Sequence, residues 1–488
     1  MKLKVKLLKL SAGRPVAILH KTLATKNSIH VDDRVLVRKN SRKIIAVVDL
    51  VVGMLKESEI AVSTEISQEL GLKEGDLIQV SPASKPASIP IIYKKLGCKP
   101  LNYKEIREII SDIVGNALTE SEIAYFISAI YRCGMSLKET KEMIQAIVST
   151  GKTLNLNKKM IVDKHSIGGI PGRTTPIVVS ICAAAGLTMP KTSSRAITSP
   201  SGTADALEVI CKVDFSIAEI KKIINKTGAC MVWGGALGLA PADDKIIQVE
   251  RLLNLDPEAQ LLASIMSKKI AMGSKYILIE IPYGKYAKVG KKEALVLKRK
   301  FEELGKEFHL HLECLLIETS QPIGNGIGPA LEIKDVIKVL KRESSCFLLE
   351  KRACILSAKL LEMTGKAKKN KGIILAKEIL DSGKAFSKFK EIIKAQQGNV
   401  NHIRDSKFKH EIISSKNCKI KEIDIKKINA LARVLGCPSD KYAGIYLHKH
   451  LHEKIKNHEI IATLYAESKQ ELHEGIKFYN KQKPIILK

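Results

Sequence analysis

The stretch from Val162 to Glu208 constrains the fold of this chain more than any other. A short apolar segment, Met160 to Val162, leads into a polar loop at 163–175 that is rich in glycine and hydroxyl side chains. An apolar helical segment follows, with Pro176 in its first turn, and a second polar loop covers 191–203. A strand, a glycine loop and a helix in this order present backbone N–H groups to an anion. We therefore expect an α/β domain with an oxyanion site, such as one for phosphate.

The rest of the 488-residue chain predicts several further domains. Period-two alternation in KLKVKL at the N-terminus indicates strands, and alternating strand and helix patterns dominate the middle of the chain. No internal repeat is apparent. We expect an α/β multidomain protein with an N-terminal β-rich domain at 1–84, a helical domain at 95–155, a large α/β phosphate-binding domain at 156–345, a helical segment completing the core at 346–415, and a C-terminal α+β domain at 416–488.

Three helices are predicted in the helical domain, at 103–116, 120–132 and 137–149. The second follows Thr119, with a glutamate three residues later, and the third follows Ser136, again with a glutamate three residues later. This spacing is that of a capping box, so both helix starts are well defined.

Charge and aromatic content limit the kinds of partner. The chain has 81 Lys and Arg against 51 Asp and Glu, which gives a net charge of +30, but only 4% of its residues are aromatic. Scarce aromatics disfavour stacking on single-stranded nucleic acid, so a basic nucleic-acid-binding protein is a distant alternative. The longest near-apolar run, 176–190, is interrupted and too short to span a membrane.

The ten cysteines are scattered and form no CxxC pair. Several lie in apolar runs, as Cys182 does, and are expected to be buried small hydrophobic residues. The N-terminal alternation predicts a strand rather than a secretion signal. Together these features predict reduced thiols in a cytoplasmic protein.

Three other motifs have weaker interpretations. Gly168-x-x-x-Gly172-Arg173-Thr174 is one residue shorter than a Walker loop and lacks its lysine, which disfavours an NTPase. Gly324-Asn325-Gly326-Ile327-Gly328 lacks dinucleotide-binding spacing and predicts a tight strand-to-helix turn. The alternating His448, His450 and His452 suggest one face of a strand; without a cysteine or carboxylate at ligand spacing we expect a basic surface edge and no metal site.

The motifs DKHSIGG (163–169), PKTSSRAITSPSGTAD (190–205), WGG with LAPADD (233–244) and ASIMSKK (263–269) resemble the thymidine and pyrimidine nucleoside phosphorylase family. The resemblance covers nearly the whole chain, and the N-terminal β domain is similar to the type 2 subgroup, which includes the AMP phosphorylases of archaea. It implies a pentosyltransferase in which phosphate attacks C1′ of a ribose and the base leaves. It also implies a homodimer whose domains close over a cleft, with inorganic phosphate as a substrate and neither metal nor organic cofactor.

The resemblance also implies roles for particular residues. The phosphate site would contain Lys164, Ser166, Ser193 and Thr203, since a cation and hydroxyl groups suit an oxyanion. On the sugar and base side it implies His165, Arg195, Ser264 and Lys268. In the AMP phosphorylase pattern the proton donor is Asp256, and the nucleotide is held by Gly168 or Gly169, by Ser194, Arg195, Ala196, Ile197, Thr198 and Ser199, and by Thr203, Ser264 and Lys288.

Two substrates fit this resemblance. Pyrimidine phosphorylases carry an arginine upstream of the SKK helix, where this chain has Val249, with Arg251 two residues out of phase. The segment RTTPIVVSI (173–181) is nevertheless similar to the bacterial thymidine phosphorylase-like members. The leading hypothesis is phosphorolysis of thymidine to thymine and 2-deoxy-α-D-ribose 1-phosphate. The alternative is an AMP phosphorylase that gives adenine and α-D-ribose 1,5-bisphosphate.

Overall fold

A computed structural model describes residues 1–156, 158–196, 199–343 and 346–488. The chain divides into two compact units, and each is described here by itself. Unit 1 comprises Met1–Gly151 and Ala240–Ser267, and unit 2 comprises Lys152–Leu239 and Lys268–Lys488. Helices and strands are mixed as the sequence predicts, so the expected multidomain α/β class is confirmed.

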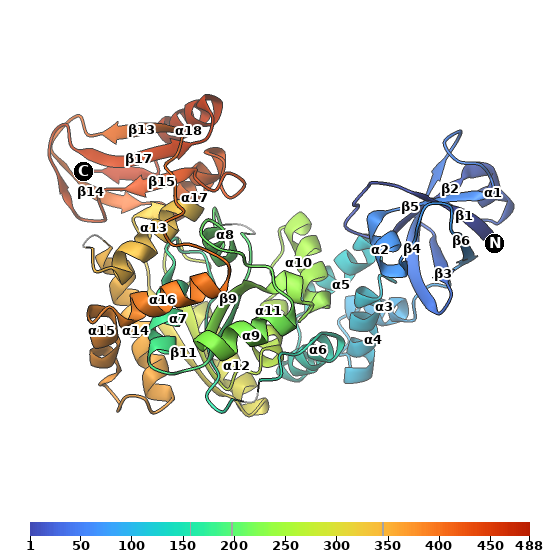
Figure 1. Ribbon diagram of the computed structural model, residues 1–488, viewed down its shortest axis with the longest axis horizontal. Helices are drawn as coiled ribbons and strands as arrows, with labels where there is room; N and C mark the ends of the chain where they lie inside the picture. The colour runs from blue at the N-terminus through green and yellow to red at the C-terminus, as the bar shows by residue number, and fades with distance from the viewer. Residues whose placement is uncertain (157, 197–198, 344–345) are drawn as a thin grey trace. The chain divides into compact units, whose positions relative to one another are not determined.

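Unit 1 begins with a closed six-stranded β-barrel (Figure 1). In the first strand Leu3 and Val5 point into the barrel and are almost fully buried, while Lys2 and Lys4 alternate with them and face water. The strand order around the barrel is β1-β5-β2-β4-β3-β6. The elements are β1 Lys2–Leu7, β2 Val16–His20, α1 Lys21–Lys26, β3 Arg34–Lys39, β4 Arg42–Val51, β5 Glu59–Val62, α2 Thr64–Leu70 and β6 Leu77–Pro82.

The barrel is an internal repeat, which corrects the expectation that the chain has none. A β-β-α-β unit occurs twice, and Asp33 in the first copy corresponds to Asp76 in the second. Val48 N–H donates to the Asp33 carbonyl at 2.9 Å, and Val5 N–H donates to the Asp76 carbonyl at 2.8 Å. Each aspartate carboxylate also accepts from the N–H three residues earlier, at 2.7 Å. The repeat lies in backbone hydrogen bonds and buried positions, with few identical side chains to reveal it in the sequence.

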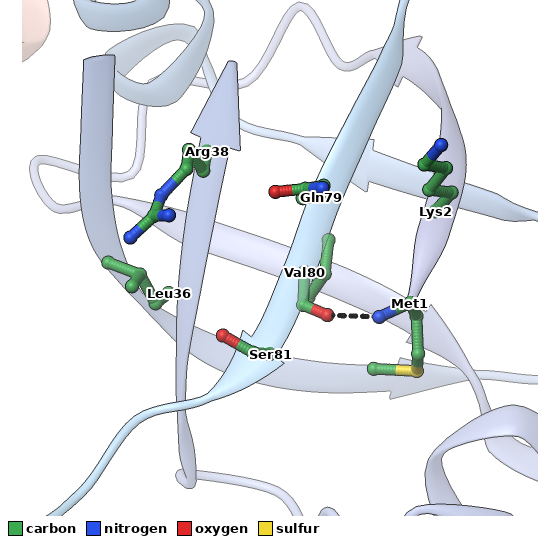
Figure 2. Close-up of a pocket in the computed structure, with 7 residues that line it drawn as sticks. All are labelled: Met1, Lys2, Leu36, Arg38, Gln79, Val80 and Ser81. Atoms are coloured by element: carbon green, nitrogen blue, oxygen red, sulfur yellow. Dashed lines mark hydrogen bonds between the residues drawn. The ribbon is translucent and has the colours of Figure 1, made fainter. Parts of the chain in front are cut away.

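A small hollow of about 330 Å³ lies on the barrel surface (Figure 2). Leu36 and Arg38 of β3 and Gln79 of β6 line it, and the N-terminal ammonium of Met1 donates to the Val80 carbonyl at 2.6 Å. None of the residues that the sequence singles out as catalytic or substrate-binding belongs to this hollow.

The helical part of unit 1 forms where the sequence predicts it. The predicted capping boxes at Thr119 and Ser136 are both present, each closed by the glutamate three residues later. The helices that begin there are amphipathic, and each buries a face that is rich in isoleucine. The helices are α3 Ser88–Leu96, α4 Tyr103–Val114, α5 Glu120–Cys133, α6 Leu137–Thr150 and α10 Pro241–Leu253, which packs on α4, α5 and α6; α11 Glu258–Ala271 continues into unit 2.

A disulfide bond joins Cys98, just after α3, to Cys133 at the end of α5. This corrects the expectation that all thiols are reduced. The two residues are 35 positions apart, and the packing of α3 on α5 brings their Cα atoms to 5.2 Å. No local sequence motif marks such a pair, because the tertiary packing creates it. The other eight cysteines are free, and Cys182 is fully buried as expected.

The first part of unit 2 contains two sets of parallel strands, of which β9 and β11 are labelled in Figure 1. One sheet has the order β11-β10-β7 and another pairs β8 with β9, and a parallel bridge from Ile161 to Thr188 joins the two sets. In parallel sheets the loops that follow neighbouring strands emerge at the same edge. The strands are β7 Val162–Ser166, β8 Met189–Ser193, β9 Ala229–Trp233, β10 Tyr276–Tyr283 and β11 His311–Glu318.

Helices cover this sheet. The helix after β7 is buried from Thr174 to Ala183, with Pro176 in its first turn as predicted, and it packs against two later helices, α14 and α16. Its apolar surface is the centre of the largest core of unit 2. The helical elements are α7 Thr174–Ala184, α8 Thr203–Leu207, α9 Ile217–Thr227, η1 Gly234–Leu237, α12 Lys291–Glu307, α13 Pro329–Leu340, α14 Phe347–Met363, α15 Gly372–Asp381 and α16 Lys384–Ala395.

The C-terminal part of unit 2 has two antiparallel sheets, β12-β15-β17-β13 and β16-β14-β18. Helix α18 packs on β13 and β17 (Figure 1). The predicted turn at 324–328 also contains the short strand β12, which joins this sheet. The elements are β12 Gly326–Ile327, β13 Phe408–Ile413, β14 Cys418–Ile423, α17 Ile425–Val434, β15 Gly444–Leu447, β16 Lys454–Ile455, β17 Ile460–Ala466, α18 Lys469–Gln482 and β18 Ile485–Leu487.

The three alternating histidines do not share a strand face, which corrects that expectation. Strand β15 ends at Leu447, and the histidines follow it in a turn where His452 has a φ of 71°. His450 contacts Asn325 at 2.7 Å through Nε2, and His448 contacts Thr463 at 2.8 Å. The alternation misled because the register of β15 with β17 ends at Leu447 and the chain then turns, so the three side chains do not follow the alternation of one strand.

Candidate active site

Asp163 to Ser166 lie on strand β7 rather than in a loop, because they pair in parallel with β10. This corrects the expected start of the first polar loop, which begins only after Ser166. Successive side chains on a strand point to opposite faces, so Asp163 and His165 share one face and Lys164 lies on the other. The strand therefore divides its charged side chains into two sets.

Lys164 is 2% exposed and forms the centre of the first set. Its Nζ lies 2.8 Å from Glu280 Oε2 and donates to Thr174 Oγ1 at 2.9 Å. Glu280 Oε1 accepts from Arg352 at 2.8 Å, and the same guanidinium donates to Thr319 at 2.9 Å. One buried carboxylate is thus shared between two buried cations.

Asp163 forms the second set on the opposite face of β7. Its carboxylate is fully buried and lies 2.7 Å from Lys269 Nζ and 3.4 Å from Lys191 Nζ. Burial lowers the pKa of Lys269 from its usual value to about 7, against the opposing effect of Asp163. Here too one carboxylate faces two basic side chains, so positive charge is in excess on each face of β7, although near pH 7 Lys269 carries only part of a charge.

His165 is half-buried beside this second set. Burial holds its pKa well below the usual value, and the positive charges of Lys269, Lys191, Lys164 and Lys268 act in the same direction. The imidazole is therefore neutral at pH 7. A neutral imidazole can donate one hydrogen bond and accept another, which suits contact with a sugar hydroxyl or a base.

The loop after β7 depends on its two glycines. Gly168 and Gly169 have φ values of 94° and 92°, which favour glycine over residues with a side chain. Around Gly168 the position of a Cβ atom is open, whereas at Gly169 it would lie 3.4 Å from the backbone nitrogen of Lys288. Lys288, itself exposed, thus lies directly beside the glycine pair. The N–H of Gly168 points to Ser166 Oγ at 3.5 Å.

Arg173 fastens the first loop to the second. Its guanidinium pairs with the buried carboxylate of Glu332 on α13 and donates to the carbonyl of Ser201. This arginine occupies the place that the Walker comparison gives to a lysine. It is engaged with protein groups on both sides, and we assign it to holding the two loops together.

The second loop runs from the end of β8 to the start of α8. Ser193 lies at the end of β8, where its hydroxyl donates to the Val232 carbonyl at 3.3 Å, and Thr203 is the first residue of α8. One oxygen of the Asp205 carboxylate accepts from two backbone N–H groups, those of Ala196 and Gly202, at 2.7 Å each. Asp205 thereby fixes both ends of the loop.

The other predicted substrate contacts of this loop are only in part among the described residues. Ser194 is exposed, and Ser199 donates to the Ser201 carbonyl at 2.8 Å. The predicted substrate contacts Ile197 and Thr198 lie outside the described residues.

Arg195 is engaged with protein groups. Its guanidinium donates to Glu208 at 2.7 Å and lies 4.6 Å from the ring centroid of Trp233. Lys441 of the C-terminal part also pairs with Glu208, at 2.8 Å. The sequence placed Arg195 beside the sugar and base, and that role stays a prediction.

Two predicted site residues belong to unit 1. Ser264 Oγ donates to Asp243 Oδ2 at 2.8 Å, and Gln260 donates to the other oxygen of the same carboxylate at 2.8 Å. Asp256 is exposed in the segment between α10 and α11. Val249, in contrast, faces the core from α10 and is 4% exposed. On α11, Lys268 follows Ser264 by one turn, as predicted, and is half-buried in unit 2.

Sequence reasoning missed several of the buried charges, above all Glu280, Arg352, Lys191 and Lys269. A signal was available for Glu280, which is a lone carboxylate inside the apolar strand YILIEIPY and needs a partner when buried. The partner could not be identified, because Arg352 is 72 residues away on α14. Among the described residues no group of three or more His, Cys, Asp or Glu could hold a metal ion. None of the helices in the described part of the chain is long and apolar enough to cross a membrane.

Known protein-family domains match three successive parts of the chain. The helical bundle domain of a glycosyl transferase family matches residues 89–151, and the a/b domain of that family matches 158–386. The C-terminal domain of pyrimidine nucleoside phosphorylases matches 419–485. An anthranilate phosphoribosyltransferase from Thermus thermophilus has the same fold over 63% of this chain and 99% of its own, with a TM-score of 0.53 and 16% identity.

Curated relatives extend over the full length. The AMP phosphorylase of Pyrococcus furiosus is 42% identical, over 99% of this chain and 97% of the relative. The AMP phosphorylase of Methanocaldococcus jannaschii is 41% identical, over 93% of this chain and 91% of the relative. A Legionella pneumophila protein named "Putative thymidine phosphorylase" is 39% identical, over 94% of this chain and 89% of the relative.

The matched family domains and the full-length relatives together define a glycosyltransferase of the pentosyl-transferring kind. The chain belongs to the glycosyl transferase family of nucleoside phosphorylases that carries the pyrimidine nucleoside phosphorylase C-terminal domain, and it is an enzyme. The family resemblance seen in the sequence is thus confirmed.

Proposed function

We propose that this enzyme is an AMP phosphorylase, the alternative of the two activities expected from the sequence. The observation that carries the choice is Val249, which is apolar and buried where the resemblance expects an arginine for the pyrimidine carbonyl. A valine offers no hydrogen-bond donor, so that mode of thymine recognition is lost. The relatives named AMP phosphorylase, at 41–42% identity over nearly the full chain, support the same choice.

The charges of unit 2 support anionic substrates. Two carboxylates around β7, Asp163 and Glu280, face four basic side chains: Lys164, Lys191, Lys269 and Arg352. Positive charge is in excess there even though Lys269 is only partly protonated near pH 7. Such an excess inside the protein favours a phosphate dianion, because buried positive charge is poorly screened by water. A nucleoside monophosphate adds a second phosphate, which the wider positive charge of the chain attracts.

The proposed reaction transfers a ribosyl group to phosphate. A phosphate oxygen bonds to C1′ while the bond between C1′ and the base nitrogen breaks, and the electron pair of that bond leaves with adenine. The phosphate nucleophile is held by Lys164, Ser166, Ser193 and Thr203. The negative charge of this phosphate stabilises the cationic sugar of the transition state. Asp256 donates the proton that the leaving base takes up.

The remaining predicted residues bind the nucleotide in this proposal. His165, neutral for the reasons given above, contacts the sugar or the base. The others keep the binding role expected from the sequence: Gly168, Gly169, Ser194, Arg195, Ala196, Ile197, Thr198, Ser199, Ser264, Lys268 and Lys288. We also propose that the enzyme works in the cytoplasm as a homodimer and needs no metal or organic cofactor. Full activity in excess EDTA, and a sedimentation mass of two chains, are the expected results.

A substrate panel tests the proposal. Purified protein with phosphate is offered AMP, CMP, UMP, thymidine and uridine, and free base is measured by chromatography. Adenine release from AMP that depends on phosphate, with a much slower release of thymine from thymidine, is the expected outcome. Thymine release without adenine release would return the leading hypothesis from the sequence, and no release from any substrate would contradict both.

A further inference from the structure

The chain Arg352–Glu280–Lys164 crosses three elements of unit 2: α14, β10 and β7. All three side chains are at least nine-tenths buried. Arg352 holds Glu280 Oε1 and Thr319 Oγ1 with two different nitrogens, which leaves Oε2 for Lys164. The guanidinium therefore leaves one carboxylate oxygen, Oε2, to the lysine.

The ammonium of Lys164 keeps one N–H free within the described part of the chain. Lys164 has three donors, and Glu280 Oε2 and Thr174 Oγ1 are its two partners there. The fixed directions of these two partners aim the third N–H away from both. A phosphate oxygen is the kind of acceptor that this remaining donor suits.

Burying this set of charges is costly by comparison with apolar side chains of the same size. An arginine, a glutamate and a lysine must all leave water, and apolar replacements of buried ion pairs often stabilise a protein. The neighbouring buried positions of α14, among them Leu349, Ala353 and Leu356, are apolar. Stability of the core alone does not require Arg352.

We propose that Arg352 is a positioning residue that sets the charge available to phosphate. Glu280 alone would neutralise Lys164, and the second cation on the same carboxylate restores a net positive charge beside the third N–H. This inference rests on the proposed phosphorolysis, because it assigns Arg352 a part in binding the phosphate substrate.

A double-mutant cycle separates this role from simple support of the fold. Arg352→Met leaves Glu280 paired only with Lys164, so KM for phosphate at saturating AMP should rise by about ten-fold or more, with smaller changes in kcat and in KM for AMP. Glu280→Gln alone should not raise KM for phosphate. In Glu280→Gln/Arg352→Met the net charge returns to that of the wild type, so KM for phosphate should recover most of the loss.

Two outcomes would overturn the proposal. One is a double variant whose KM for phosphate is no better than that of Arg352→Met. The other is an equal rise in KM for AMP and for phosphate. If Arg352→Met does not fold, Arg352→Lys tests the same point, because lysine keeps the positive charge but loses one of the two directed contacts. The KM of Arg352→Lys for phosphate should stay within about three-fold of the wild type. A ten-fold rise would count against the charge argument.

A matched control and a direct binding measurement complete the design. Lys95 pairs with Glu139 at 2.7 Å in unit 1, with both side chains buried, so Lys95→Met removes a comparable buried cation. It should lower thermal stability and leave KM for phosphate unchanged. Calorimetry of inorganic phosphate binding to the wild-type enzyme distinguishes failure of this proposal from failure of the proposed function. If phosphate does not bind and no base is released, the proposed function is refuted. If the wild type turns over normally but the effects of Glu280→Gln and Arg352→Met simply add in the double variant, only the role of Arg352 is refuted.

Discussion

Lys269 Nζ lies 2.7 Å from Asp163 Oδ2, and both side chains are withdrawn from water. Because Lys191 shares the same carboxylate, burial prevails and the pKa of Lys269 falls to about 7 from a usual value of 10.5. Between these two values the unfolded chain binds more protons than the native state at this site. The group therefore destabilises the fold fully below pH 7, and this penalty fades as the pH rises from 7 towards 10.5.

We expect wild-type stability to gain on that of Lys269→Met between pH 7 and 9, by at most about 1.4 kcal/mol per pH unit. Urea unfolding at several pH values measures the difference between the two proteins. Lys275→Met, which removes an exposed lysine nearby, serves as the control and should show no such trend. Parallel pH profiles for Lys269→Met and wild type would contradict the prediction.

Lys164→Ala should lower kcat/KM for phosphate by at least about a hundred-fold, because it removes the cation nearest the proposed nucleophile. It should also destabilise the protein by about 3 kcal/mol, the low end for a broken buried pair, since Arg352 still pairs with Glu280. Steady-state kinetics and urea unfolding measure the two effects. Turnover at the wild-type rate would remove Lys164 from the phosphate site.

Gly202→Ala should disturb the second loop although it adds a single methyl group. The new Cβ would lie 2.5 Å from the Ser194 carbonyl oxygen and 2.6 Å from the carbonyl carbon of Arg195, so the backbone must move. We expect KM to rise by about ten-fold or more for the nucleotide or for phosphate. Gly97→Ala, where the nearest atom is 3.4 Å away, should leave both constants unchanged. Equal kinetics for the two variants would contradict this view of the loop.

Asp256→Asn should reduce the rate of adenine release by about 10²–10⁴-fold, the usual contribution of a general acid. Because Asp256 is exposed, the thermal midpoint should change little. A nucleotide whose base already carries a positive charge, such as a 7-methylpurine monophosphate, needs no proton for departure and should lose less. The same loss with both substrates would argue against the proton-donor role.

Replacing both Cys98 and Cys133 by serine should destabilise unit 1 by about 4 kcal/mol, since the bond closes a loop of some 35 residues. Thermal unfolding with and without reductant measures the effect on the wild type, and reductant should not affect the double variant. Cys418→Ser, at a free and half-buried thiol, is the matched control. Identical unfolding of oxidised and reduced wild type would show that the bond contributes nothing.

Local signals were read correctly because they act over short distances in the chain. The capping boxes at Thr119 and Ser136, and Pro176 in the first turn of α7, each depend on residues within one turn of helix. The strand–loop–helix order around β7 and α7 was likewise read correctly, while the anion site that it suggests stays a prediction. Errors arose where partners lie far apart, as in the Cys98–Cys133 bond and in the repeated backbone hydrogen bonds of the barrel.

The sequence by itself determined the family and the order of most elements, and it supplied the side chains that we propose bind phosphate, because these depend on local patterns and long motifs. Only the tertiary structure decided which charged groups those side chains face and where they are aimed. Lys164 looks like an isolated loop cation in the sequence, yet it lies buried on β7 and shares Glu280 with Arg352, which is 72 residues beyond Glu280. Electrostatic energy depends on distance and burial in space, and chain separation gives no measure of either.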